Sequence, residues 1–228
     1  HNLQVYAGMI AALDRSVGKV VAKLKDLEIY GKTLIIFTSD NGGANYIELE
    51  DINKPYRGWK ISFFEGGIRV PYIVSWPDEI NSGQKSDSPV HHFDIFSTIA
   101  AAAKVTPSNE KEIDGVNLLP FIKKEKLSQP HKTLFWRSGN HQSVLHENWK
   151  YIISKKENIR WLFDTSTDPL EKNNIIDIHP EETNLIEGLL SKFNSEQKEP
   201  LFPSAYEVPI LIDKYDGEQY VEGDEYIY

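Results

Sequence analysis

TLIIFTSDNGGANY, residues Thr33–Tyr46, is an apolar run that stops abruptly at polar residues and two glycines. Thr33–Thr38 is continuously apolar or β-branched, which is typical of a parallel strand covered on both faces. In an open parallel sheet, ligands collect at the carboxyl ends of the strands. Because Asp40 and Asn41 directly follow this run, we predict a buried strand with a functional loop at its tip.

The segments on either side of this strand predict further strands and helices. Apolar residues recur at three- and four-residue steps from Tyr6 to Leu27, which predicts a long amphipathic helix. Val70–Trp76 (VPYIVSW) predicts a second strand, and Asp94–Ala103 (DIFSTIAAAA) predicts the next helix. An alternation of this kind favours an α/β layered fold.

The sequence changes character after about Lys124. Short runs rich in β-branched and aromatic residues, separated by polar turns, predict an antiparallel meander: Thr133–Arg137, Trp149–Ile153 and Arg160–Phe163. Glu182–Phe193 predicts a helix packed on that sheet. From about Asp213 the chain is acidic and rich in tyrosine, and we interpret it as an extended arm or partly ordered tail that is either solvated or laid over its own domain.

These segments predict three parts of the chain. Residues 1–125 form part of an α/β core, residues 126–200 form a small antiparallel α+β subdomain, and residues 201–228 form the acidic, Tyr-rich C-terminal arm. The total of 228 residues is enough for one large domain or for a domain with a small appendage.

Composition excludes several classes of function. The chain has no cysteine, so it has no disulfide, no zinc-thiolate site and no Cys nucleophile. Its net charge of −9 and the absence of a basic stripe argue against a nucleic-acid partner. No apolar run approaches the ~20 residues that span a bilayer. The opening His1-Asn2-Leu3-Gln4 is not a signal peptide and leads directly into the helical pattern, so we expect upstream sequence to be missing.

Asp40 and Asn41 are candidate metal ligands. A carboxylate beside an amide carbonyl offers hard oxygen donors, which suit Ca²⁺ or Mg²⁺ rather than zinc. The alternative is an Asx turn in which Gly42 and Gly43 supply positive φ angles. For an isolated Asp-Asn-Gly-Gly we favour the Asx turn, and the residues downstream are needed to decide between the turn and a metal site.

The block YRGWKISFFEGGIRVPYIVSWP, Tyr56–Pro77, contains the second candidate site. Lys60 lies on a glycine-flanked loop near a strand end, where a lysine can hold an anionic group, although an isolated lysine there is as well read as a solvated surface cation. Glu65 and Arg69 are spaced to close the loop through an ion pair or backbone hydrogen bonds, and we interpret this pair as structural.

Taken together, these blocks resemble the C-terminal half of formylglycine-dependent, arylsulfatase-like sulfatases of the alkaline-phosphatase superfamily. The resemblance rests on YAGMIAALDRSVGKVVAKL, TLIIFTSDNGG and RGWKISFFEGGIRVPYIVSWP, in that order and spacing, and continues through HHFDIFSTIAAAAKV, IDGVNLLPFI and WKYII…WLFDTSTDPLEKNNI. It covers roughly residues 5 to 178. It implies the C-terminal part of an alkaline-phosphatase-like layered α/β/α fold with a small antiparallel sheet-plus-helix subdomain.

The resemblance also implies roles for individual residues. Asp40 and Asn41 correspond to ligands of a calcium site, with Mg²⁺ as an alternative ion. Lys60 corresponds to the lysine that binds the sulfate, and it would stabilise the charge that develops on the ester oxygen. His141 lies in a loop of the small subdomain, which walls the substrate pocket in related enzymes, so we expect it to contact the substrate. His91 and His92 are as well explained by capping of the following helix.

The chain departs severely from the family pattern, because features of the family's N-terminal half are missing. The family's formylglycine is made from a cysteine or serine in a Cys/Ser-x-Pro/Ala-x-Arg motif near the N-terminus, where two further aspartates complete the metal site. Neither the motif nor an Asp-Asp pair before SDNGG occurs here. We therefore expect a fragment that is inactive alone, whose partners are a sulfated small molecule or glycan and the N-terminal half of the same protein.

Three functions remain open at this point. The leading one is a sulfuric ester hydrolase, in a periplasmic or secreted location. The second is a phosphonate or phosphate ester hydrolase of the same superfamily. The third is a non-catalytic domain that retains the metal-binding loop for stability or for binding.

Overall fold

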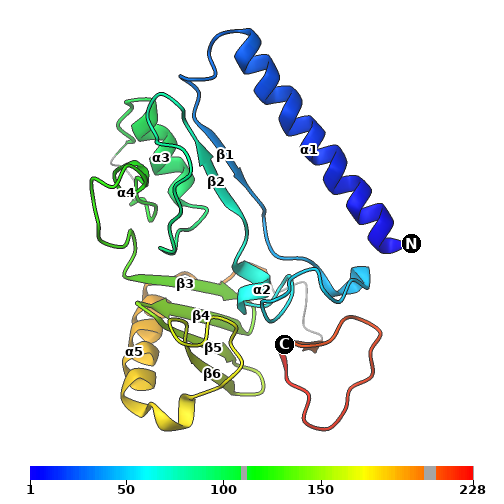
Figure 1. Cartoon of the computed structure of the whole chain (residues 1–228). Coiled ribbons are helices and arrows are strands. Elements are labelled where there is room, and N and C mark those ends of the chain that lie inside the picture. The colour runs from blue at the N-terminus through cyan, green and yellow to red at the C-terminus, as the bar shows by residue number, and fades with distance from the viewer. Residues whose placement is uncertain (109–111, 203–208, 228) are drawn as a thin grey trace. The chain divides into compact units, whose positions relative to one another are not determined.

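The computed structural model describes residues 1–108, 112–202 and 209–227 (Figure 1). The chain divides into two compact units. The first contains His1, Leu3–Thr38 and Pro71–Lys132, and the second contains Asn2, Ser39–Val70 and Thr133–Tyr228. The division thus groups the loop after the first strand with the C-terminal residues. The limits at residues 125 and 200 stay a prediction.

The described part of the first unit contains two strands and three helices. Their bounds are α1 Asn2–Asp26, β1 Ile35–Thr38, β2 Tyr72–Ser75, α3 Asp94–Ala102 and α4 Leu119–Ile122. The predicted strands and helices of this unit are therefore confirmed, with ends that differ by at most four residues. No residue of α1 is buried, although its sequence has the period of an amphipathic helix.

The expected parallel pairing is wrong. Strands β1 and β2 form an antiparallel ladder in which Ile35 lies opposite Ser75 and Thr38 lies opposite Tyr72. All four residues of β1 are half-buried. An apolar run indicates that neither face of a strand meets water freely, but it does not determine the direction of the neighbouring strand.

The second unit is built on an antiparallel sheet of four strands in the order β3-β4-β5-β6. These are Thr133–Ser138, His141–His146, Trp149–Ser154 and Ile159–Asp164, and α5, Pro180–Glu196, packs on the sheet (Figure 1). The predicted meander and its helix are confirmed. Strand β4 was missing from the prediction because its polar residues, HQSVLH, lack the strong alternation of a half-buried strand.

The remaining elements of the second unit are short. They are the 3-10 helices Asn45–Ile47 and Ile176–Ile178, the single-turn helix α2 Glu65–Ile68, and the strands β7 Ile210–Leu211 and β8 Tyr226–Ile227, which pair antiparallel. The acidic C-terminal segment is therefore folded over its own domain in its described part, residues 209–227. Residues 203–208 and 228 of the predicted arm lie outside the described residues.

The four-stranded sheet is covered on both faces because successive side chains point to opposite sides. One face, with Tyr151, packs against α5 through Ile186 and Leu190. The other face, with Ile152 and neighbouring aromatic residues, packs against Phe64, and each of these side chains is fully buried. Burial of a side chain such as Phe64 contributes about 1.5–3 kcal/mol, so the loop that carries it is firmly attached to the sheet.

Among the described residues, no helix is both long enough and apolar enough to cross a bilayer.

Candidate functional site

Two pairs of glycines hold the candidate loops together. The amide of Gly42 donates to the carbonyl of Gly67 at 2.8 Å. A Cβ on Gly42 would lie 1.8 Å from the carbonyl oxygen of Gly66, and a Cβ on Gly66 would lie 2.3 Å from that of Gly58. Only glycine allows such close backbone approach. The φ angles of Gly42 and Gly43 are not in the left-handed region, so the expectation of positive φ is wrong and the requirement is steric.

Asn53 connects the two candidate segments. Its Oδ1 accepts from the amide of Gly43 at 2.7 Å, and its Nδ2 donates to the carbonyls of Gly43 and Gly58 at 2.9 and 3.0 Å. The amide of Lys60 also donates to the carbonyl of Gly43 at 2.9 Å. The segment that carries Asp40 and the segment that carries Lys60 are therefore one hydrogen-bonded assembly within the second unit.

Asp40 and Asn41 present oxygen atoms from the tip of the loop. Asp40 is exposed, and its Oδ1 accepts from the amide of Asn41 at 2.9 Å. The Nδ2 of Asn41 donates to the carbonyl of Gly42 at 3.1 Å, which leaves its Oδ1 without a hydrogen bond among the described residues. A free amide oxygen beside an exposed carboxylate suits a hard cation. In the described part of the chain, however, no three His, Cys, Asp or Glu side chains gather as a metal site, so these two residues fit as only part of one.

Lys60 is half-buried and makes no ion pair with any described residue. The residue after it, Ile61, has a φ of +85°. A β-branched residue in this region is a genuine outlier, and such conformations cost about 1–3 kcal/mol and persist only where the surroundings impose them. The packing of the second unit therefore fixes the turn that presents Lys60.

His141 lies in the interior beside this turn. Its side chain is 2% exposed, its ring lies 4.6 Å from that of Phe63, and its Nε2 has no hydrogen-bond partner in the described structure. Burial lowers the pKa of His141 to about 4, although a hydrogen bond with the backbone of Ile61 opposes that shift. The ring is therefore neutral at pH 7. The expected contact with a substrate stays a prediction.

A buried triad of charged residues connects the segment that follows Lys60 to strand β5. Nζ of Lys150, on β5, lies 2.6 Å from Oε1 of Glu65 and 2.8 Å from Oε1 of Glu171. Oε2 of Glu171 accepts from the amide of Glu65 at 2.6 Å. The side chains of Lys150 and Glu171 are completely buried. The triad thus joins the WKYII, EGGIR and DPLEKNN blocks of the sequence.

The pKa values of the triad follow from one cation between two carboxylates. Burial alone would lower the pKa of Lys150, but Glu171 and Glu65 outweigh burial and raise it. Burial alone would raise the pKa of Glu65, but Lys150 and, to a smaller extent, Arg69 outweigh burial and lower it. Burial raises the pKa of Glu171. Arg69 lies 3.2 Å from Glu65, which confirms the structural ion pair predicted for these two residues.

Sequence reasoning missed the residues that support the loop, chiefly Lys150, Glu171 and Arg57. The signal in the sequence that could have found them is Lys150, a lysine within an apolar strand, since an unpaired lysine almost never lies in a core. Its position in WKYII indicates that carboxylates from elsewhere must meet it.

His91 and His92 are placed at the start of α3. The amide of His91 donates to Oδ2 of Asp94 at 2.8 Å, and the ring of His131 lies 2.8 Å from Oδ1 of the same carboxylate. Burial lowers the pKa of His91 to about 4. These contacts give Asp94 a structural role at the entry to α3, but no described side chain caps the N-terminus of the helix, so a capping role of the His91 side chain is not shown.

Two families match this chain. Residues 1–105 match the family described as Sulfatase, and residues 58–199 match the family described as N-sulphoglucosamine sulphohydrolase, C-terminal. N-acetylgalactosamine-6-sulfatase of Sus scrofa is 36% identical over 137 residues, which are 59% of this chain and 26% of that protein. Steryl-sulfatase of Homo sapiens is 38% identical over 138 residues, or 58% of this chain and 24% of that protein. The chain thus spans about a quarter of the length of these relatives.

Solved structures show the same fold. The crystal structure of Ps i-CgsB is 30% identical, with a TM-score of 0.77 over 87% of this chain and 44% of that chain. A phosphonate monoester hydrolase of Agrobacterium radiobacter, at 23% identity and a TM-score of 0.63 over 86% of this chain and 42% of that chain, shares the fold alone. The predicted fold class, the C-terminal part of an alkaline-phosphatase-like α/β fold, is confirmed. More than half of the chain matches the second family, so the chain belongs to the sulfatase family, with residues 58–199 matching the family's C-terminal domain.

Proposed function

We propose that this chain is the C-terminal portion of a hydrolase of sulfate esters. The observation that carries the proposal is the hydrogen bond from the amide of Lys60 to the carbonyl of Gly43. It joins the loop whose lysine has no ion pair among the described residues to the loop with two oxygen donors, within a chain of the sulfatase family. A cation and hard metal ligands on one rigid assembly suit a tetrahedral anion.

Lys60 is proposed to bind the sulfate group and to stabilise negative charge on the departing ester oxygen. An ammonium about 4 Å from a unit negative charge contributes about 4 kcal/mol at an effective dielectric constant near 20. The turn at Ile61 is held in a strained conformation, so little reorganisation accompanies binding. A substrate contact by His141 is proposed as well, and it requires Nε2 to become accessible when the substrate binds.

Asp40 and Asn41 are proposed to supply two ligands of a calcium ion, with Mg²⁺ as the alternative. A divalent ion there would supply positive charge next to the sulfate oxygens. Because Ca²⁺ takes 6–8 oxygen ligands, the remaining ligands must come from outside this pair. We propose that they come from the N-terminal half of the same protein, together with a formylglycine nucleophile.

The surface of α1 supports a further segment of protein as a partner. Apolar side chains along this helix are strongly exposed: Leu3 is 66%, Met9 65% and Leu13 48% exposed. Large exposed apolar patches mark surfaces that contact other segments or proteins. We propose that the N-terminal half covers this helix. A periplasmic or secreted location stays a prediction, and the substrate class is proposed as a sulfated small molecule or glycan.

The experiment is an intact-mass measurement of the protein purified from its source, followed by an assay of the same sample. A mass well above 26.1 kDa and hydrolysis of 4-nitrophenyl sulfate in preference to a 4-nitrophenyl phosphonate ester would support the proposal. Preference for the phosphonate would reassign the substrate. A mass near 26.1 kDa with no hydrolysis of either ester would leave a non-catalytic domain as the correct function.

A further inference from the structure

The C-terminal arm, defined here as residues 209–227, lies beyond the residues that match either family. It is nevertheless built into the second unit. Strands β7 and β8 pair at its two ends, and Ile212 and Ile227, each 1% exposed, pack with Phe64 and the aromatic residues of β6. The arm therefore shares one core with the segment that follows Lys60.

Two carboxylates of the arm bind Arg57, the residue that opens the RGWK segment. Nε and Nη2 of Arg57 donate to Oδ1 and Oδ2 of Asp213 at 2.8 and 2.6 Å, a bidentate pair. Glu225 accepts a further hydrogen bond from Nη2 and also accepts from Nε1 of Trp161 at 2.7 Å. Nη1 donates to the carbonyl of Glu171 at 3.3 Å. All three guanidinium nitrogens of Arg57 are thus occupied.

The guanidinium is also placed by packing. Its carbon lies 5.0 Å above the ring of Phe64, and the side chain of Arg57 is only 13% exposed. Burial alone would lower the pKa of Arg57, but the hydrogen bonds that it donates to Asp213 and Glu225 outweigh burial and raise it. The nearly buried guanidinium of Arg57 requires Asp213 and Glu225 as partners, because an unpaired buried cation is strongly unfavourable.

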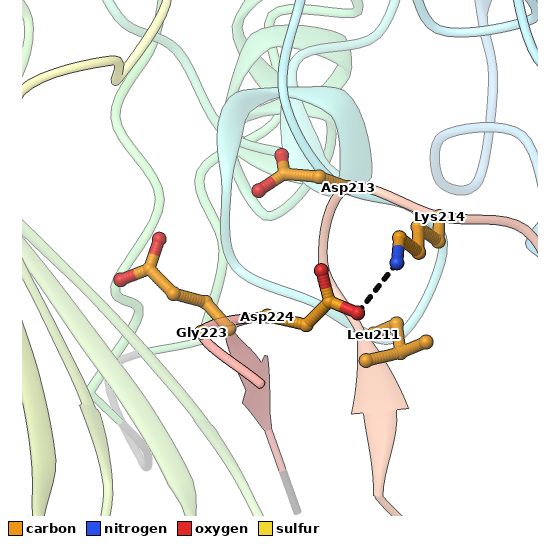
Figure 2. A pocket seen from close by; sticks show the side chains of 6 residues that line it. Leu211, Asp213, Lys214, Gly223 and Asp224 are labelled. Atoms are coloured by element: carbon orange, nitrogen blue, oxygen red, sulfur yellow. Dashed lines mark hydrogen bonds and ion pairs between the residues drawn. The ribbon is translucent and has the colours of Figure 1, made fainter. Parts of the chain in front are cut away.

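The arm closes on itself without help from Arg57. Lys214 on one limb forms an ion pair with Asp224 on the other, drawn as a dashed line in Figure 2. Nζ of Lys214 lies 2.5 Å from Oδ2 of Asp224, and the same oxygen accepts from the amide of Val221 at 2.7 Å. The amide of Asp216 donates to the carbonyl of Asn45 at 3.3 Å. The arm therefore has contacts of its own in addition to those that Asp213 and Glu225 make with Arg57.

The connection from Arg57 to Lys60 is short. The carbonyl of Arg57 accepts from the amide of Gly66 at 2.6 Å, and a Cβ on Gly66 would lie 2.6 Å from that carbonyl oxygen. Three residues after Arg57, the amide of Lys60 bonds the carbonyl of Gly43. A shift of Arg57 thus displaces both the double glycine and the lysine.

We propose that the C-terminal arm is a clamp in which Asp213 and Glu225 act as positioning residues, holding Arg57 and thereby the loop that presents Lys60. The consequence for turnover rests on the proposed function of Lys60. The clamp itself does not, because loop order can be measured without any substrate.

The test compares the Asp213→Asn/Glu225→Gln variant with the Asp216→Asn/Glu222→Gln variant in the longest natural form of the protein. Both double variants remove two carboxylates of the arm, and the control pair makes no side-chain contact with Arg57. Asp213→Glu is the conservative variant that keeps the carboxylate. Ile212 and Ile227 stay unchanged in all of them, so the core of the arm is retained.

The first readout is amide hydrogen exchange. In the test variant, amides of residues 57–67 should exchange about tenfold faster or more, since loss of hydrogen bonds to a charged group shifts local opening by at least that factor. Exchange in strand β5 should accelerate less than exchange in residues 57–67, and exchange in the control variant should not change. Unchanged exchange in residues 57–67 overturns the clamp.

The second readout is hydrolysis of 4-nitrophenyl sulfate. The test variant loses stability because it removes both carboxylate partners of Arg57, so turnover is compared at a temperature at which every variant is fully folded. At that temperature the test variant should lose kcat about tenfold, and Asp213→Glu should recover most of it. A faster-exchanging loop with unchanged kcat overturns the positioning role. If the parent protein hydrolyses no sulfate ester, the proposed function fails, and the exchange result alone decides the clamp.

Discussion

Replacing Lys150 by methionine should destabilise the second unit strongly. The side chain of Lys150 is fully buried, and its Nζ lies 2.6 and 2.8 Å from two carboxylates. Each contact is worth about 6 kcal/mol in gross Coulomb energy at an effective dielectric constant of 20, most of which offsets desolvation. What the variant loses is the partner of two buried charges. We expect the free energy of unfolding to fall by about 3–5 kcal/mol.

The assay is urea unfolding at pH 7 followed by tryptophan fluorescence, because Trp161 is fully buried in the same unit. Lys155→Met is the matched control at an exposed lysine just after β5, and such surface changes usually stay within about 0.5 kcal/mol. A triple variant that adds Glu65→Gln and Glu171→Gln should recover much of the loss, since it removes the unpaired charges. A loss below about 1 kcal/mol for Lys150→Met, or no recovery in the triple variant, would refute the reasoning.

Three further outcomes are expected. The pKa of His141 is about 4 in the folded chain and 6.5 ordinarily, so the unfolded chain is protonated first as the pH falls. The contribution of His141 to the free energy of unfolding should therefore be complete above pH 6.5 and fall by about 3 kcal/mol towards pH 4. In thermal unfolding, His141→Gln should flatten this dependence of stability on pH. Gly42→Ala should lower the free energy of unfolding by about 1–3 kcal/mol in urea, because the new Cβ meets the carbonyl of Gly66. Gly188→Ala, in open space on α5, should be neutral or stabilising. Equal effects of the two substitutions would contradict the steric account. Asp40→Ala in the complete protein should abolish the rise in melting temperature on adding Ca²⁺, and a persisting rise would exclude Asp40 as a ligand.

Periodicity was sufficient for most elements of this fold. The helices before and after the apolar strand, and three strands of the meander, lie where apolar spacing puts them, although no residue of α1 is buried. The direction of β2 relative to β1 was beyond reach, since a run such as LIIF describes its own burial and not its neighbour. Strand β4 has buried polar residues, Gln142 and Ser143, that carry no hydrophobic signal.

The candidate loops could be located from sequence, but their support could not. Gly42 and Gly43 were attributed to a turn, whereas in the structure the missing Cβ of Gly42 lets two backbones approach and that of Gly43 leaves room for the side chain of Ile52. Lys150, Glu171 and Asp213 are far apart in sequence and are each of a type that is ordinarily exposed. Their pairing depends on tertiary packing, which no local pattern encodes.

The most direct measurement is the turnover of 4-nitrophenyl sulfate by the longest natural form of the protein, with Lys60→Ala and Lys85→Ala beside it. Lys85 is an exposed lysine outside the candidate loops and serves as the control. We expect Lys60→Ala to lower kcat by about 10²–10³ while the melting temperature stays within a few degrees of the parent, and Lys85→Ala to leave both unchanged. Equal kcat for all three proteins, or a loss of turnover in Lys60→Ala that merely follows a loss of stability, would contradict the assignment of the sulfate site to this loop.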